Sequence, residues 1–266
     1  PEDPRCDLAG PDGDWPARLE AAKASMRAFF DEHGASLAAF IAEPLVQGAG
    51  GMRFWPVELL AELREACTRH GVYLIADEVM TGFGRTGTFF ACEQAAIAPD
   101  LMCLSKGLTG GILPMSLTWA TEEIYGHFLG RWEEGRAFLH GHSFTANPIA
   151  CAVASASLAL FDEEPVMARA GVLHETLKEA WRSLAALPGI RKARVRGIIA
   201  AAQMVDPATG EPHPASARAG LDLHRRALDH GLFVRPMGDC LYLLPPLSTP
   251  PGRIREAVAV LGELLA

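Results

Sequence analysis

The sequence lacks the features of nucleic-acid-binding and membrane-spanning proteins. It contains no run of lysine or arginine, and its formal net charge of −8 does not favour binding to a polyanion. Its longest stretch of small apolar residues, Ile149–Phe161, is too short to cross a bilayer. Internal repeats and low-complexity tracts are also missing. We therefore expect neither nucleic acid nor a membrane among the partners of this chain.

Paired cysteines are absent as well. The six cysteines are scattered, form no Cys-x-x-Cys pair and mostly lie within apolar runs, so we expect free thiols in a reducing compartment. The segment Pro1–Asp14 is polar, rich in proline, and shows no apolar core of a signal peptide. Together these observations predict a cytoplasmic protein.

The composition is that of a globular protein, with 49% apolar and 21% charged residues in a chain of 266. In residues 1–162, helical and strand patterns alternate, which predicts an α/β domain with a parallel sheet covered by helices. The expected helices are Ala17–His33, Val57–His70 and Pro148–Phe161, and the expected strands are Ser36–Ala42, Val72–Asp77, Leu101–Leu104 and Met115–Ala120.

The pattern changes near Asp162, and residues 163–266 are expected to form a smaller α+β domain. The loop expected over Asp206–Ser216 carries three prolines. The expected helices are Val166–Leu187, Ala217–His230 and Gly252–Leu265, and the expected strands are Arg194–Val205, Leu232–Arg235 and Leu241–Leu244.

The most informative feature is a pair of expected strands that each run into one charged residue, Asp77 and Lys106. Taken alone, Asp77 could be a helix cap or an ion-pair partner, and Lys106 could be an ordinary strand-end lysine. Ligands of open α/β sheets bind beyond the carboxyl ends of the strands, so both side chains are expected in one crevice. A carboxylate and an amine placed in this way suit a pyridine-ring cofactor held through the lysine.

Three further motifs have competing interpretations. Gly82–Gly87 spells the GxGxxG of a dinucleotide-binding turn, but four residues separate it from the strand that ends at Asp77, and a glycine-hinged loop beside another ligand fits better. His140 and His142 could share a metal ion but lack a third ligand, and the same turn before Pro148 could offer donors to a phosphate. Arg235, at the end of an expected strand, pairs either with a structural carboxylate or with an anionic ligand.

At these residues the sequence resembles the class III aminotransferases of fold type I, which depend on pyridoxal 5′-phosphate. The resemblance runs from about Phe40 to the C-terminus. It is carried by the motifs IAEP and QGAGG (41–51), LIADEV-x-TGFGRTG (74–87), SKG-x-TGG (105–111) and HG-x-[ST]-F-x-x-NP (140–148). Residues 89–93, 104–111 and 234–236 most resemble the members that act in biotin synthesis, which transfer the amino group of S-adenosylmethionine to 7-keto-8-aminopelargonate.

The resemblance implies a role for each matching residue. Lys106 is the Schiff-base lysine and general acid–base, Asp77 pairs with the pyridine nitrogen, and Val79 packs against the ring. His142 and Ser143 contact the cofactor phosphate across a homodimer interface. The implied substrate-binding residues are Gly141, Arg235 (for the pelargonate carboxylate) and, as a pocket neighbour, Tyr242. The substrates are small molecules, exchanged in a ping-pong reaction.

The sequence departs from the family pattern at three positions and in its extent. Met80 replaces a common glutamine, Ser143 a threonine, and His142 the proline common in the biotin enzymes. The Gly-Ser phosphate turn and the aromatic residue that stacks on the cofactor do not occur before Phe40. We therefore expect this to be the C-terminal portion of an enzyme, which binds the cofactor poorly by itself. Another class III ω-aminotransferase with a different amino donor, or a fragment without activity, remain the alternatives.

Overall fold

The structure is a computed structural model that describes residues 2–8 and 14–266. The polar segment Pro1–Asp14 therefore falls partly outside the described residues. In the part that is described, Pro4–Cys6 form a 3-10 turn, η1, and Asp7 forms an isolated bridge with Arg194.

The larger sheet contains β1 (Ala39–Ala42), β4 (Tyr73–Asp77), β5 (Leu101–Leu104) and β6 (Leu117–Ala120), in the order β1-β4-β5-β6. β1, β4 and β5 are parallel, as predicted, but β6 is antiparallel to β5. The sheet is therefore mostly parallel, with β6 as its antiparallel edge strand. Between β5 and β6 the chain forms only the short turn η4 (Lys106–Thr109), and without a crossover helix it returns in the opposite direction.

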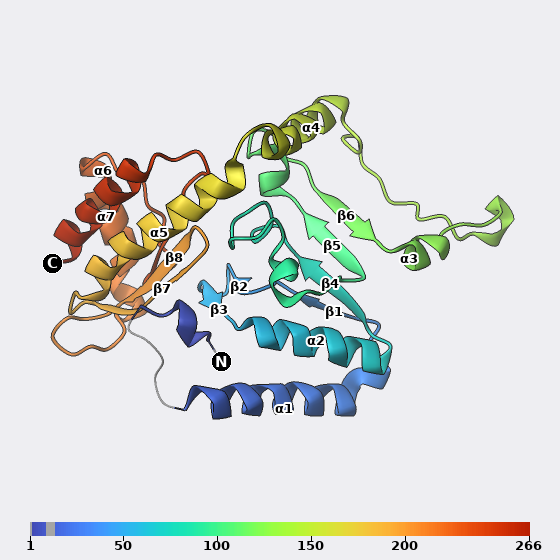
Figure 1. Ribbon diagram of the computed structural model, residues 1–266, viewed down its shortest axis with the longest axis horizontal. Helices are drawn as coiled ribbons and strands as arrows, with labels where there is room; N and C mark the ends of the chain where they lie inside the picture. Colours follow the sequence, from blue (N-terminus) through green and yellow to red (C-terminus); the bar gives the residue numbers. More distant parts are fainter. Residues whose placement is uncertain (1, 9–13) are drawn as a thin grey trace.

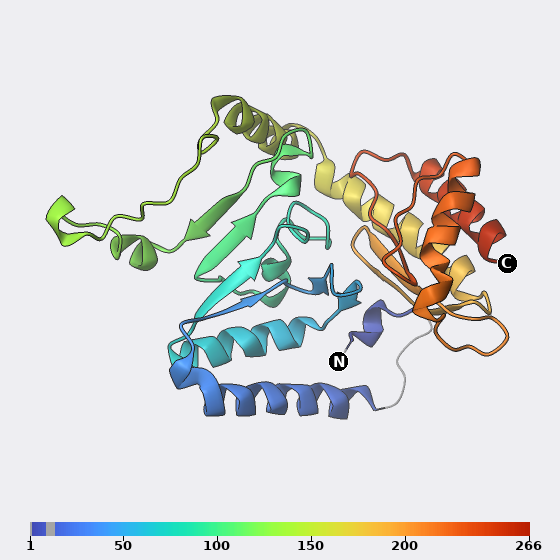
Figure 2. The ribbon, with the colours of Figure 1, turned by 180° about the vertical axis from the view of Figure 1, so that it is seen from behind.

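Two helices cover one face of this sheet. α2 (Val57–His70) lies between the sheet and α1 (Trp15–His33), as Figures 1 and 2 show. Phe30 of α1 and Leu63 of α2 belong to one buried cluster with Leu74 of β4. α2 begins and ends as predicted, because Gly71 adopts the left-handed conformation that terminates a helix, with φ 65°.

The smaller sheet contains β7 (Ile190–Arg196), β8 (Ile199–Met204) and β9 (Cys240–Leu243) in antiparallel order. It packs with α5 (Val166–Ala185), α6 (Ala219–Asp229) and α7 (Pro251–Leu265) (Figure 1). Trp181 of α5 is fully buried in this core, and its Nε1 donates to the Ala201 carbonyl at 3.1 Å. α4 (Pro148–Glu163) precedes α5, and its Ala154 packs near the end of β5.

Two expected strands of the C-terminal region were wrong. The single strand expected over Arg194–Val205 is a hairpin that reverses at Gly197, where φ is +54°. The reversal was missed because only Gly197 and Ile198 separate the two strands, and a single glycine within a strand-like run does not by itself mark a turn. Leu232–Arg235 is not a strand. There the Val234 carbonyl accepts a hydrogen bond from the His224 ring (2.5 Å) instead of a neighbouring strand.

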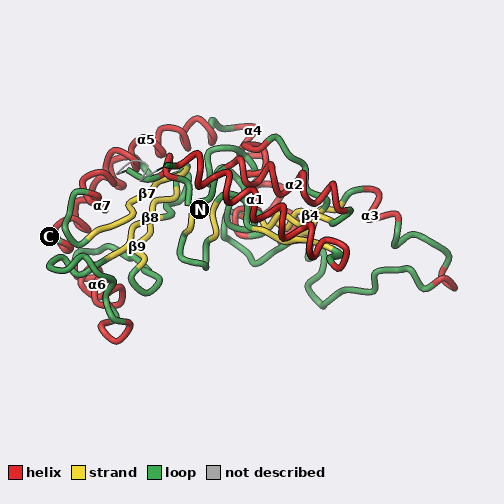
Figure 3. Tube along the Cα trace, turned by 90° about the horizontal axis from the view of Figure 1, so that it is seen from below, coloured by secondary structure: helices red, strands yellow, loops and turns green. Residues whose placement is uncertain are grey.

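The remaining short elements were not predicted. A hairpin of β2 (Val46–Gln47) and β3 (Arg53–Phe54) closes around the glycines at 48–51, and each strand is too short to show a periodicity. The segment 127–147 follows α3 (Glu122–Gly126) and projects away from the sheets (Figure 3).

The six cysteines are the free thiols that the sequence predicts. All six cysteines are free, and burial raises the pKa of the Cys67 thiol to about 11, which keeps it protonated. Within residues 2–8 and 14–266, no helix combines the length and the apolar character needed to cross a membrane.

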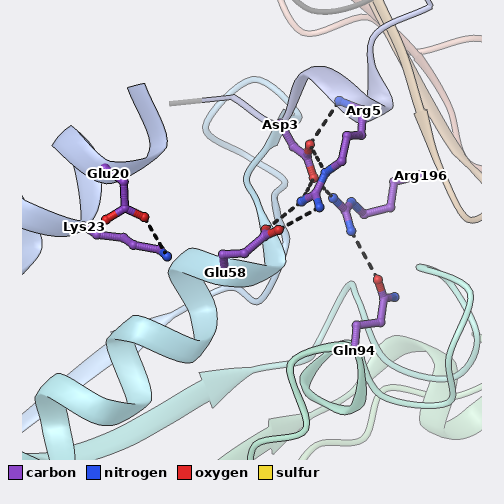
Figure 4. A network of polar contacts seen from close by, with 7 residues as sticks. All are labelled: Asp3, Arg5, Glu20, Lys23, Glu58, Gln94 and Arg196. Carbon is purple, nitrogen blue, oxygen red and sulfur yellow. Dashed lines mark hydrogen bonds and ion pairs between the residues drawn. The ribbon is translucent and has the colours of Figure 1, made fainter. Parts of the chain in front are cut away.

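A buried carboxylate joins the N-terminal segment to β7 and, through Arg5, to α2. The Asp3 carboxylate accepts from Arg5 (2.8 and 2.9 Å) and from Arg196 of β7 (2.6 Å), as Figure 4 shows. Arg5 also donates to Glu58 of α2, at 2.8 and 2.7 Å, and Arg196 donates to Gln94 at 3.2 Å. Burial alone would raise the pKa of Asp3, but its hydrogen bonds with Arg5 and the charge of Arg196 hold that pKa below 3.8.

The β7–β8 turn packs on the loop that follows β4. The Ile198 N–H donates to the Arg85 carbonyl at 3.0 Å. A Cβ on Gly197 would lie 2.3 Å from that carbonyl oxygen and 2.5 Å from the carbonyl carbon of Thr86. The backbones are thus in direct contact, and only glycine allows this approach.

Replacing Asp3 tests the carboxylate junction. Asp3→Asn should lower the free energy of unfolding by about 3 kcal/mol near pH 7, because Arg196 would stay buried without its counter-charge. Since the pKa of Asp3 is lowered by folding, its contribution is complete above about pH 4 and is lost as the pH falls further. The difference between variant and parent should therefore shrink as the pH falls below about 4 in urea titrations. Glu20→Gln, at an exposed ion pair with Lys23, is the control and should cost under about 0.5 kcal/mol. Equal stability of Asp3→Asn and the parent at pH 7 would contradict the assignment.

Replacing Gly197 tests the contact between the two backbones. Gly197→Ala should destabilise the protein by about 2–4 kcal/mol, because the new Cβ meets backbone atoms and the residue has a positive φ. Gly171→Ala is the matched control. Gly171 lies in α5 with no atom within 4 Å of its added Cβ, so this change should be neutral or stabilise by up to about 1 kcal/mol. The two melting temperatures should move apart, and a common shift would argue against the close approach.

Candidate cofactor and substrate site

Asp77 and Lys106 lie at the same edge of the larger sheet. Asp77 is the last residue of β4 and is in register with Cys103 of the parallel neighbour β5. The Glu78 N–H extends this ladder by donating to the Cys103 carbonyl at 3.0 Å. Lys106 follows three residues after Cys103, so both charged side chains leave the sheet at its carboxyl edge, the usual place of ligands in such sheets.

The Asp77 carboxylate is held at the strand end by its own loop. It is half-buried, and its Oδ1 accepts the N–H of Val79 at 3.1 Å. Among the described residues it caps no helix and forms no ion pair. The helix cap and the ion pair that the sequence allowed for Asp77 are therefore not observed in the described residues, and its second carboxylate oxygen is available to a ligand.

Lys106 presents an exposed amine. It begins η4 with a φ of +43°, a conformation that costs a non-glycine residue energy. Within the described part of the chain its amine has neither a hydrogen bond nor an ion pair. The next residue must be glycine, because a Cβ on Gly107 would lie 2.7 Å from the Phe83 ring. The turn thus displays an unpaired amine at the edge that also carries Asp77.

The QGAGG motif lies against the same region. The Gly48 N–H donates to Glu43 Oε2 at 2.9 Å, and a Cβ on Gly48 would lie 2.6 Å from Met80 Sδ. Met80 follows Asp77 by three residues, so two motifs that are distant in the sequence meet beside the strand ends.

Two residues of the loop after β4 were not singled out in the sequence. Glu78 is fully buried and accepts from Thr81 Oγ1 (2.5 Å) and from the Cys92 N–H (2.9 Å), which fixes the loop. Arg85 donates to the Pro245 carbonyl at 2.6 Å, and burial lowers the pKa of its guanidinium. The sequence did contain a signal for both residues, because each is charged and lies within the motif DEVMTGFGRTG.

The Gly82–Gly87 loop is not a dinucleotide-binding turn. No α-helix begins directly after this loop, where only the 3-10 turn η3 (Ala91–Ala95) follows. Its backbone instead receives the β7–β8 hairpin at Arg85. The loop therefore lacks the helix N-terminus on which a pyrophosphate would bind.

Arg235 and Tyr242 share one cavity of about 430 Å³, which Pro245, the acceptor of Arg85, also lines. Arg235 is exposed and has no ion pair among the described residues. The structural ion pair considered for Arg235 is thus not observed, and its guanidinium remains available to an anion.

The structure places Gly141, His142 and Ser143 away from the sheet, in the projecting segment 127–147 (Figures 1 and 2). All three are exposed, and the His142 N–H and carbonyl bond to Thr145, at 2.9 Å each. No hydrogen bond joins them to Asp77 or Lys106. Within the described residues no group of three metal-ligating side chains exists, so His140 and His142 have no third ligand there.

Known proteins resemble this chain over most of its length. A family model described as aminotransferase class-III matches residues 9–265. The adenosylmethionine-8-amino-7-oxononanoate aminotransferase of Geobacter sulfurreducens is 44% identical over 219 residues, 82% of this chain and 48% of that protein. The protein of the same name from Helicobacter pylori is 37% identical over 251 residues, 93% of this chain and 56% of that protein. The chain spans about half the length of these curated relatives.

Solved structures show the same arrangement of elements. The adenosylmethionine-8-amino-7-oxononanoate aminotransferase of Methanocaldococcus jannaschii has a TM-score of 0.87 at 34% identity, covering 91% of this chain and 57% of that one. A transaminase from the marine bacterium Virgibacillus has a TM-score of 0.81 at 28% identity, covering 92% and 56%. The family model matches nearly the whole chain, and this chain therefore belongs to the class III aminotransferases.

Proposed function

We propose that this chain carries the lysine and the aspartate of a pyridoxal-phosphate-dependent active site. The reaction proposed is transfer of the amino group of S-adenosylmethionine to 7-keto-8-aminopelargonate, which gives 7,8-diaminopelargonate in biotin synthesis. The observation that carries the proposal is the position of Asp77 and Lys106 at the ends of two neighbouring parallel strands. The relatives named for this reaction, at up to 44% identity, support the choice of substrates.

The residues present fit pyridoxal phosphate. When bound, this cofactor supplies an electron sink that makes proton loss from the donor's α-carbon feasible. Asp77, whose second oxygen is unbonded, keeps the pyridine nitrogen protonated. The Lys106 amine holds the cofactor and, once released, moves a proton between the α-carbon of the donor and the C4′ position. Val79, whose N–H bonds to Asp77, packs against the ring.

The substrate side of the proposal rests on Arg235 and Tyr242. Both line the 430 Å³ cavity, and the guanidinium of Arg235 has no carboxylate partner among the described residues. A fork of two N–H donors matches a carboxylate, so Arg235 binds the carboxyl end of the pelargonate chain. Tyr242 borders the same substrate.

The projecting segment completes the site in a homodimer. His142 and Ser143 contact the cofactor phosphate of the other subunit, and Gly141 lies next to the substrate. This assignment is supported by the exposure of all three residues and by their distance in the fold from the larger sheet (Figure 1). It also accounts for the exposed Phe138, Leu139 and Phe144 around them.

The proposed fold assignment is fold type I. In it, residues 1–162 form the C-terminal part of the large cofactor-binding domain, and residues 163–266 form the small domain. The presence of separate sheets in the two regions supports this division.

The role of Lys106 can be tested by reductive trapping. Lysine occurs only at 23, 106, 178 and 192, so each labelled peptide is unambiguous. Borohydride treatment of the chain with pyridoxal phosphate should fix the cofactor on Lys106 in excess over the other three, as measured by peptide mass spectrometry. Lys106→Arg should abolish this label, whereas Lys23→Arg, at an exposed ion pair, should leave it unchanged. Equal labelling of all four lysines would favour the inactive alternative.

The role of Arg235 can be tested with the two substrates separately. Arg235→Gln should weaken binding of 7-keto-8-aminopelargonate about tenfold or more, because its carboxylate loses a bidentate partner. Conversion of the cofactor by S-adenosylmethionine should not change. Arg225→Gln, at an exposed arginine of α6, is the control. If small amines convert the cofactor as well as S-adenosylmethionine does, the protein is an ω-aminotransferase with another donor.

A further inference from the structure

A second cavity, of about 470 Å³, lies between the N-terminal segment, α5 and the β7–β8 hairpin. It contains none of the residues of the proposed cofactor and substrate site. Thr86 and the backbone turn at Gly197 border it. Its wall is rich in basic side chains that come from three separate parts of the chain, namely Arg5, His174, Lys178, Arg182 and Arg196.

The positive charge of this wall is only partly compensated. Arg5 and Arg196 are matched by the carboxylates of Asp3 and Glu58 (Figure 4). The side chains of Lys178 and Arg182 contact no carboxylate, because within the described residues neither side chain forms a hydrogen bond or an ion pair. They stand one helical turn apart on α5, where like charges repel. The remaining acid of the wall, Asp7, has an interaction of its own.

One donor of the wall is buried without an acceptor. The Arg196 side chain is only 9% exposed, and its two terminal nitrogens bond to Gln94 and Asp3. Its Nε has no hydrogen-bond partner among the described residues. A buried donor without a hydrogen bond costs free energy. A ligand acceptor that binds beside Arg196 removes this cost, and its hydrogen bond therefore contributes more than one formed at an open surface.

We propose that this cavity binds the phosphate group of a small phosphorylated molecule. Two uncompensated cations, Lys178 and Arg182, match the charge of a phosphate dianion, and its oxygens can accept from Arg196 and Thr86 as well. Inorganic phosphate would fill only part of 470 Å³, which leaves room for the organic part of a phosphate monoester. The site is separate from the cofactor and does not depend on the proposed transamination.

Calorimetric titration tests the proposal. Inorganic phosphate and glycerol 3-phosphate are each added to the chain, with sodium chloride at equal ionic strength as the reference. We expect saturable binding of one phosphate per chain, with the ester bound at least as tightly. Lys178→Gln combined with Arg182→Gln should weaken both affinities about tenfold or more. Arg225→Gln removes the same charge from an exposed site on α6 and should change them less than about twofold.

Three experimental outcomes would contradict the proposed phosphate site. These are an absence of saturable phosphate binding, an unchanged affinity in the double variant, and an equal loss in Arg225→Gln. Neither Lys178 nor Arg182 contributes a hydrogen bond or an ion pair to the described fold, so the variant should keep the melting temperature of the parent. If it does not, the single variant Lys178→Gln, judged by the same three criteria, decides.

Discussion

The parallel pairing of β4 and β5 is the constraint on which the candidate site depends. Two strands that run side by side in the same direction must end at the same edge, so the residues that follow them are neighbours whatever their distance in sequence. Here that edge receives Asp77 and, three residues beyond its register partner, Lys106. The glycine after Lys106 then fixes the turn, because any larger residue would meet the Phe83 ring. A shift in this register would separate the acid from the amine.

Arginines connect the strand-end region to the C-terminal sheet, and their acceptors are largely backbone carbonyls. Arg194 of β7 is buried and donates to Met52 and Gly51 in the loop of the QGAGG motif, at 2.8 and 2.9 Å. Arg85 of the TGFGRTG loop donates to Pro245, which lines the cavity of Arg235. Guanidinium groups can supply several donors in one plane, so a single side chain can join segments that are far apart in sequence. These hydrogen bonds therefore connect the loops beside the proposed cofactor site to the cavity proposed for the substrate.

Several large apolar side chains are exposed in the projecting segment 127–147. The projecting segment 127–147 carries Trp132, Phe138 and Leu139, which are 78%, 68% and 82% exposed. Exposed apolar groups in such number are typical of surfaces that bind other protein segments. The proposed contact of His142 and Ser143 with a second subunit would use this same segment. The 430 Å³ cavity, by contrast, is lined by residues that lie between Leu177 and Ala257 of the chain.

The sequence by itself determined the family, the ends of the long helices to within two residues, and the positions of Asp77 and Lys106 at the carboxyl ends of two buried strands. Those features depend on local chemistry, such as the glycine that ends α2 and the apolar runs that stop at Asp77 and Ser105. Only the tertiary structure decided the direction of β6, the reversal at Gly197 and the absence of a strand at Leu232–Arg235, because each depends on which segment packs alongside. The junction of Asp3 with Arg196 was equally out of reach, since no local pattern marks a contact across 193 residues. Short-range preferences can therefore be read from the chain, whereas strand direction and buried charge pairing depend on which surfaces meet.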